Sequence, residues 1–253
     1  MQLGNIINKL EKNFKAHKFS GICSDSNEIN KGDIYFALKG KKKNGNNFIE
    51  DAIKKGAKTI ISDNKFEGFK KNILYIYNKN PRKLLSEAAS KFYKNKPNNL
   101  VAVTGTNGKS SIANFYFQIL KLNNVKAASI GTLGINTPKS NFTTDNTTLD
   151  PINLNKTLTN LKTKKINNII LEASSHGLKQ YRLHGNQFDI GIFTNLSRDH
   201  LDYHKTFKNY FDSKMILFNK LMKKNALIIY ENNLWFSKKL QNIAKKKKLK
   251  LFQ

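Results

Sequence analysis

The chain has 253 residues, which is enough for one large domain or two ordinary domains with a buried core. Its formal net charge is +28, yet every basic residue except Arg82, Arg182 and Arg198 is a lysine, and the lysines are spread along the whole chain. Surfaces that bind nucleic acid normally use arginine forks and aromatic stacking, so the composition argues against a nucleic-acid-binding function. The single cysteine, Cys23, excludes an internal disulfide, and no apolar stretch is long enough to span a membrane. We therefore expect a cytoplasmic protein that binds neither nucleic acid nor membrane.

The first third of the sequence predicts a small α/β domain. Apolar residues at helical spacing predict a helix over residues 1–18, and the segments that follow predict strands 34–38, 59–61 and 74–77 and helices 48–55 and 81–93. Residues 94–99 are polar, contain Pro97 and lack periodicity. We place a domain boundary there, between a domain of residues 1–97 and a domain of residues 98–253.

Residues 100–120 predict a phosphate-binding loop between a strand and a helix. Residues 100–103 are apolar and predict a buried strand, and Gly105 and Gly108 then let backbone N–H groups turn inward toward a phosphate. Lys109 can reach the outer phosphates of ATP, and the Ser110 hydroxyl can ligate Mg²⁺. The general P-loop pattern requires glycine where Val103 stands, so only its shorter form is present. The helix that follows is predicted to place one apolar face inward, formed by Ile112, Phe115, Tyr116, Ile119 and Leu120.

A second buried strand, residues 168–172, ends on the carboxylate of Glu172. In doubly wound sheets, ligands lie beyond the carboxyl ends of the strands, so Glu172 is expected to face the phosphates. Mg²⁺ prefers one or two carboxylates together with phosphate oxygens and water, which favours a site shared by Glu172 and Ser110. The alternative is a glutamate at a strand end that faces solvent.

His200 and His204 are four residues apart, as zinc ligands on a helix would be. Leu201 stands where a zinc protease carries glutamate, so that activity is disfavoured; His200 is either structural or associated with Mg²⁺. Lys214 lies within an apolar helical stripe and has two interpretations. Its ammonium either extends into water, or it is a partly buried amine that reacts with CO₂ to give a carbamate ligand for a metal.

The segment 143–151 is rich in hydroxyl groups. Asp150 is expected to cap a helix that begins at Pro151. This leaves Thr147 and Thr148 without a structural explanation, and their hydroxyls could bind a second anionic substrate beside the phosphate loop.

Taken together, Gly105–Ser110, Thr147–Thr148, Glu172–Leu178 (Glu-Ala-Ser-Ser-His-Gly-Leu) and Thr194–His204 (Thr-Asn-Leu-Ser-Arg-Asp-His-Leu-Asp-Tyr-His) resemble the Mur ligase family, and within it the MurE type. The resemblance extends over about residues 20–235. It implies an α/β fold in which a small N-terminal UDP-substrate-binding domain precedes an incomplete P-loop ATPase domain with a mainly parallel sheet. It also implies an ATP-dependent ligase of cell-wall synthesis, acting as a monomer. Such a ligase adds the third amino acid, meso-diaminopimelate or L-lysine, to UDP-N-acetylmuramoyl-L-alanyl-D-glutamate through an acyl phosphate.

The resemblance also assigns roles to individual residues. Lys109, Glu172, His200 and Lys214 are implied to be catalytic, with Ser110, Glu172 and His200 around Mg²⁺ and Lys214 carbamylated. ATP is implied to lie on Gly105, Thr106, Asn107, Gly108, Lys109, Ser110 and Ser111. Contacts to the UDP-muramoyl dipeptide are implied for Ser26, Asn146, Thr147, Thr148, Ser174, Gln180 and Arg182. Asn27 departs from the family pattern, which has arginine there.

Family members continue into a C-terminal domain that binds the incoming amino acid, and the sequence suggests that this domain is absent here. Three alternatives therefore stay open: a truncated nucleotide-binding fragment without turnover, another Mur or folylpolyglutamate-type ligase, and a basic nucleic-acid-binding protein. The last predicts tight DNA binding that depends steeply on salt.

Overall fold

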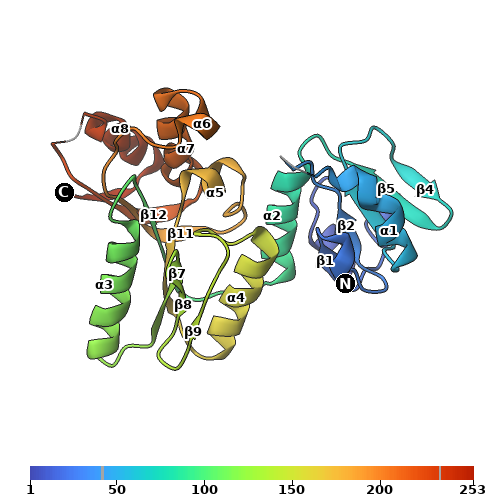
Figure 1. Cartoon of the computed structure of the whole chain (residues 1–253), viewed down its shortest axis with the longest axis horizontal. Helices are drawn as coiled ribbons and strands as arrows, with labels where there is room; N and C mark the ends of the chain where they lie inside the picture. Colours follow the sequence, from blue (N-terminus) through green and yellow to red (C-terminus); the bar gives the residue numbers. More distant parts are fainter. Residues whose placement is uncertain (41–42, 234) are drawn as a thin grey trace. The chain divides into compact units, whose positions relative to one another are not determined.

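The computed structural model describes residues 1–40, 43–233 and 235–253, which form two compact units, Met1–Phe92 and Tyr93–Gln253. Both units are built on sheets that are mainly parallel, as expected for the α/β class (Figure 1). Within the described ranges, no helix is both long enough and apolar enough to cross a bilayer.

The first unit carries a sheet with the strand order β1-β2-β3-β5-β4, in which only the β4–β5 pair is antiparallel. Its strands are β1 (Ile22–Cys23), β2 (Ile34–Phe36), β3 (Thr59–Ser62), β4 (Gly68–Lys70) and β5 (Ile73–Tyr77), and its α-helices are α1 (Ile49–Lys54) and α2 (Pro81–Phe92). Its short 3₁₀ helices are Leu3–Asn5, Lys12–Phe14, Ser26–Glu28 and Gly45–Phe48.

The helix predicted for residues 1–18 is wrong. The segment instead folds back on itself: the Leu3 N–H donates to the His17 carbonyl at 3.0 Å, and the Phe19 N–H donates to the Met1 carbonyl at 2.9 Å. Its apolar residues Leu3, Ile6, Ile7 and Phe14 are nevertheless buried. The helical spacing recorded which residues enter the core, but the long-range pairing of the two ends decided the backbone conformation.

The second unit has the strand order β13-β12-β11-β6-β10-β7-β8-β9, parallel from β13 to β7 and antiparallel in the β7-β8-β9 meander. Its strands are β6 (Asn99–Thr104), β7 (Ala127–Gly131), β8 (Gly134–Asn136), β9 (Asn141–Phe142), β10 (Asn168–Glu172), β11 (Phe188–Phe193), β12 (Met222–Tyr230) and β13 (Lys250–Phe252). Its helices are α3 (Lys109–Leu122), α4 (Pro151–Thr163), α5 (Ser175–Lys179), α6 (Leu201–His204), α7 (Phe207–Lys220) and α8 (Ser237–Lys247).

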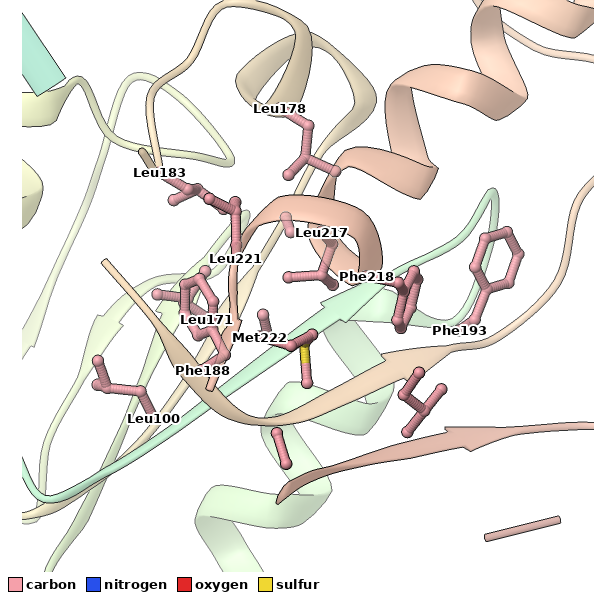
Figure 2. Packing of buried hydrophobic residues seen from close by; sticks show 14 of the residues in the cluster. Leu100, Leu171, Leu178, Leu183, Phe188, Phe193, Leu217, Phe218, Leu221 and Met222 are labelled. Atoms are coloured by element: carbon pink, nitrogen blue, oxygen red, sulfur yellow. The ribbon is translucent and has the colours of Figure 1, made fainter. Parts of the chain in front are cut away.

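The core of this unit lies on both faces of its sheet. Alternate residues of β6 point to opposite faces, so Leu100 and Ala102 join the cluster under α4, α7 and α8, while Val101 and Val103 pack under α3. Figure 2 shows the larger cluster, where strand residues such as Phe188 and Met222 meet Leu217 and Phe218 of α7. The sheet is thus held between helices, and its carboxyl edge is fixed in position.

The inward face predicted for α3 is partly wrong. Ala113 and Phe117 are the buried residues, whereas Phe115 and Ile119 are 60% and 58% exposed. The small side chain of Ala113 lets the helix backbone approach β6 and β10 closely, so the line of contact runs through Ala113 and leaves Phe115 and Ile119 on the outer flank.

Candidate functional site

Residues 105–108, the predicted phosphate loop, lie between β6 and α3, so the expected strand, turn and helix are confirmed. Gly105 has φ 149° and Gly108, which caps α3, has φ 81°. A Cβ atom on Gly105 would lie 1.8 Å from Thr194 Oγ1, so only glycine fits there. The loop therefore depends on glycine both for its backbone conformation and for its close approach to the segment after β11.

That segment also holds the loop through hydrogen bonds. The Thr106 N–H donates to the Asn195 carbonyl at 3.0 Å, the Asn107 N–H donates to Asn195 Oδ1 at 2.9 Å, and Thr194 Oγ1 donates to the Asn107 carbonyl at 2.6 Å. Thr106 Oγ1 lies 3.0 Å from the Tyr210 hydroxyl of α7. The loop is thus shaped by side chains that come from two other elements.

Two lysines meet at one carbonyl of this loop. Lys109 Nζ donates to Gly105 O at 3.1 Å and to Thr106 O at 2.7 Å, and Lys214 Nζ donates to Gly105 O at 2.6 Å. Burial lowers the pKa of Lys109, although the negative charges of Glu172 and Asp199 act to raise it. Burial, together with the charge of Lys109, lowers the pKa of Lys214 to about 7. A large fraction of Lys214 is therefore neutral near pH 7.

Lys214 is 1% exposed and its ammonium lies 4.5 Å from the centre of the Tyr210 ring. This excludes the interpretation in which the side chain extends into water. The apolar stripe around it is buried as expected, with Phe211, Phe218 and Leu221 in the core.

Glu172 is buried at the end of β10 and its carboxylate faces the start of α3. Ser110 Oγ donates to Glu172 Oε2 at 3.0 Å, and the Thr132 N–H donates to Glu172 Oε1 at 2.8 Å. A Cβ on Gly131 would lie 2.1 Å from Glu172 Oε1. The alternative of a solvent-facing glutamate is therefore wrong, since Glu172 is 2% exposed.

His200 does not take part in the hydrogen bonds that join Ser110, Glu172 and Thr132. Its Nε2 is 3.4 Å from Asp199 Oδ2, both side chains are about half exposed, and its ring centre is 4.8 Å from that of His176. Among the residues that the structure describes, no three His, Cys, Asp or Glu side chains lie together as a metal-binding group. The hard oxygen donors that suit Mg²⁺ are the Ser110 hydroxyl and the Glu172 carboxylate.

A polar network at the start of α5 joins five of the residues singled out from the sequence: Thr148, Glu172, Ser174, Gln180 and Arg182. Thr148 Oγ1 donates to the Glu172 carbonyl at 2.8 Å and lies 3.0 Å from Ser174 Oγ, which caps α5. Arg182 Nη1 donates to the Thr148 carbonyl at 2.6 Å, and Arg182 also donates to Gln180 Oε1. Thr147 Oγ1 is 3.0 Å from Thr132 Oγ1. This network starts at Glu172, the residue that faces the phosphate loop.

Three predicted residues, Ser26, Ser111 and Asn146, lie outside the contacts described above. Asn146 and Ser111 are exposed. Ser26 belongs to the first unit, where it is buried in the wall of a cavity of about 450 Å³. That cavity is lined by Ser24, Asp25, Ser26, Asn27, Tyr35, Leu38, Gly40, Lys43, Gly45, Phe48 and Arg82.

Sequence reasoning missed Thr132, Asn195 and Tyr210. Thr132 directly follows β7 and Asn195 is the second residue after β11, so the rule that singled out Glu172 could also have found them. Tyr210 gave no such signal, because its role depends on how α7 packs against the loop.

Family comparisons agree with this geometry. A family model described as "Mur ligase middle domain" matches residues 103–253, and one described as "Mur ligase family, catalytic domain" matches residues 18–93. A protein of Rickettsia montanensis named "UDP-N-acetylmuramoyl-L-alanyl-D-glutamate--2,6-diaminopimelate ligase" is 42% identical over 236 residues, 89% of this chain and 47% of that protein. A protein of the same name from Bradyrhizobium diazoefficiens is 41% identical over 84% of this chain and 44% of its own length.

Solved structures give the same result. One described as "Structure of UDP-N-acetylmuramoyl-L-alanyl-D-glutamate--2, 6-diaminopimelate ligase" matches with a TM-score of 0.84 and 27% identity, over 99% of this chain and 51% of that one. This chain thus spans about half the length of the curated relatives that it matches. With more than half of its residues matched by the middle-domain model, the chain belongs to the Mur ligase family.

Proposed function

We propose that this chain provides the nucleotide-binding part of a MurE-type ligase. The reaction joins an amino acid to UDP-N-acetylmuramoyl-L-alanyl-D-glutamate with cleavage of ATP, and the relatives' names favour 2,6-diaminopimelate over lysine as that amino acid. The observation that carries the proposal is the convergence of Lys109, Ser110 and Glu172 at the carboxyl edge of the sheet. Since the substrates are ATP and a nucleotide-linked precursor, we place the reaction in the cytoplasm.

In the proposed reaction, the terminal carboxylate of the dipeptide attacks the γ-phosphorus of ATP, the bond from that phosphorus to ADP breaks, and an acyl phosphate and ADP form. The amine of the incoming amino acid then attacks the acyl carbon, and inorganic phosphate leaves as the amide bond forms. Lys109 would balance charge on the transferring phosphoryl group, and the loop N–H groups would orient it. The chain's contribution is therefore mainly positioning and charge stabilisation.

Mg²⁺ fits the oxygen donors at Ser110 and Glu172, and we include His200 as a third, more distant member of this site. When bound, the ion would neutralise negative charge on the phosphates. Within the chain itself, Thr132 fixes the Glu172 carboxylate from the side opposite Ser110. These two contacts hold the Glu172 carboxylate in place.

Further assignments of substrates and of a modification belong to the same proposal. The UDP-linked end of the substrate is assigned to the cavity around Ser26, in a domain of residues 1–97, and ATP to a domain of residues 98–253. The dipeptide end is assigned to Thr147, Thr148, Ser174, Gln180 and Arg182, with Asn146 at its margin. Carbamylation is assigned to Lys214, whose buried amine is neutral enough to react with CO₂.

Nucleotide binding is tested by isothermal titration of the full chain with Mg·ATP. Replacing Lys109 by alanine is expected to weaken ATP binding at least about tenfold, because a charge-assisted contact to phosphate is lost. Lys121→Ala, at the exposed end of the same helix, is the matched control and should bind ATP normally. Unchanged affinity in Lys109→Ala would show that the phosphate loop is wrongly assigned.

Turnover is tested separately by phosphate release in the presence of ATP, the UDP-muramoyl dipeptide and 2,6-diaminopimelate. Release that requires all three substrates supports the ligase. ATP binding without any release supports the alternative of a nucleotide-binding fragment without turnover.

Carbamylation is tested with ¹³C-labelled bicarbonate. A carbamate carbon signal is expected in the unmodified chain at a pH above about 7, where the amine is neutral, and it should be lost in Lys214→Arg. A signal that persists in Lys214→Arg would place the modification elsewhere.

A further inference from the structure

His204 is a buried histidine for which the proposed reaction has no role. It lies between α5 and α7, 4% exposed, with Nε2 at 3.0 Å from Ser175 Oγ and Nδ1 at 3.2 Å from Ser213 Oγ. One imidazole therefore joins the two helices through both of its nitrogens.

The hydrogen-bond partners decide which nitrogen carries the proton. Ser213 has one hydroxyl proton, and it donates that proton to the Asn209 carbonyl at 2.6 Å. Ser213 Oγ can then only accept from His204, so Nδ1 is the protonated nitrogen. Nε2 is left with a lone pair and accepts the hydroxyl proton of Ser175.

The surroundings of the ring favour its neutral form. Burial is the main cause that lowers the pKa of His204, and positive charge on His176, His200, Lys214 or Lys179 acts in the same direction. The rings of Tyr203 and Tyr210 also pack against the imidazole. The His204 backbone is also held in place, because Asn209 Nδ2 of α7 donates to the His204 carbonyl at 3.1 Å.

The two serines lie next to residues of the candidate site. Ser175 follows Ser174, which caps α5 and contacts Thr148. Ser213 precedes Lys214, which donates to the phosphate loop at Gly105. A displacement at either serine would therefore be passed to a residue that the proposed reaction uses.

We propose that His204 is a positioning residue: a neutral imidazole in the Nδ1–H form that fixes Ser175 of α5 relative to Ser213 of α7 and so couples the Thr148–Ser174 network to Lys214. The tautomer follows from hydrogen bonds alone, whereas the importance of the coupling for the reaction rests on the proposed function.

The tautomer is tested by long-range ¹H–¹⁵N correlation spectra of the full chain labelled at histidine. The expected pattern for His204 at neutral pH is a protonated Nδ1 and an unprotonated Nε2. An Nε2–H tautomer, or a ring protonated at both nitrogens, would overturn the proposal whatever reaction the protein performs.

The coupling is tested with Ser175→Ala, a change that touches neither Lys214 nor the phosphate loop. We expect it to shift the NMR signals of the Lys214 side chain, assigned by their loss in Lys214→Arg, and to weaken Mg·ATP binding about three- to tenfold. Ser213→Ala should have the same two effects and also move His204 toward the Nε2–H form.

Ser237→Ala is the matched control. Ser237 is a buried serine at the start of α8, and its hydroxyl donates to the Glu231 carbonyl at 3.0 Å. It should lower the melting temperature without changing the Lys214 signals. If the Ser175 variant behaves like this control, the coupling is absent. If the unmodified chain does not bind ATP, the proposed function fails, but the Lys214 signals still decide the coupling.

Discussion

At the scale of single residues, the burial of Lys214 makes the stability of the chain depend on pH. Its pKa of about 7 in the folded chain lies below the ordinary lysine value of 10.5, which it has in the unfolded chain. Between these two values the unfolded state binds more protons, so stability rises with pH across that interval. The destabilisation is fully present below pH 7 and is relieved above it.

We therefore predict that Lys214→Met raises the free energy of unfolding, most strongly below pH 7 and progressively less toward pH 10.5. Urea unfolding at a series of pH values measures this difference. Lys220→Met, at the exposed end of the same helix, should show no such trend. A gap between Lys214→Met and the unmodified chain that stays constant with pH would contradict the burial of a neutral amine.

Gly131 tests the position of the Glu172 carboxylate. Its φ is not in the left-handed region, so the obstacle to alanine there is the Glu172 side chain, whose Oε1 would lie 2.1 Å from the new Cβ. Gly131→Ala is expected to displace Glu172 and to weaken the Mg²⁺-dependent part of ATP binding. In a Glu172→Ala background, the same change should have little further effect on affinity. Titrations with and without Mg²⁺ measure both, and additive losses would argue against the contact.

At the scale of elements, α4 shows local sequence and tertiary structure in agreement. Asp150 Oδ1 accepts the N–H groups of Ile152 and Asn153, both at 3.0 Å, and Pro151 opens the helix, as predicted. Asp150→Ala should lower the free energy of unfolding by about 0.5–2 kcal/mol. Asp150→Asn should lower it much less, because asparagine also caps helices. Denaturant unfolding compares the two, and equal losses would mean that charge rather than capping matters.

The elements also show where sequence reasoning ends. Strand β10 could be predicted with its terminal Glu172 because an apolar run followed by a carboxylate is a local pattern. The pairing that closes residues 1–18 could not, because it joins Met1 to Phe19 through backbone groups that every sequence carries. The same holds for Tyr210, whose contact to the phosphate loop depends on packing between distant segments.

At the scale of the whole molecule, the net charge of +28 is expected to lower stability through repulsion between like charges. Lysines far outnumber carboxylates, so most of them cannot each have an acidic partner, and like charges repel one another across the surface. Screening should relieve this repulsion. We predict that the melting temperature rises as NaCl is raised from about 0.01 M to about 0.15 M, measured by thermal unfolding. A melting temperature that falls over this range would mean that attractive ion pairs outweigh the repulsion.

The contacts of Lys109 have one more consequence. Its ammonium has two oxygen acceptors in the chain's own backbone, Gly105 O and Thr106 O. The desolvated cation therefore has partners within the loop, and a bound phosphate would exchange these carbonyl oxygens for phosphate oxygens. The enthalpy of that exchange is the difference between two sets of hydrogen bonds, so the gain from this lysine should come chiefly from the full negative charge of its new acceptors.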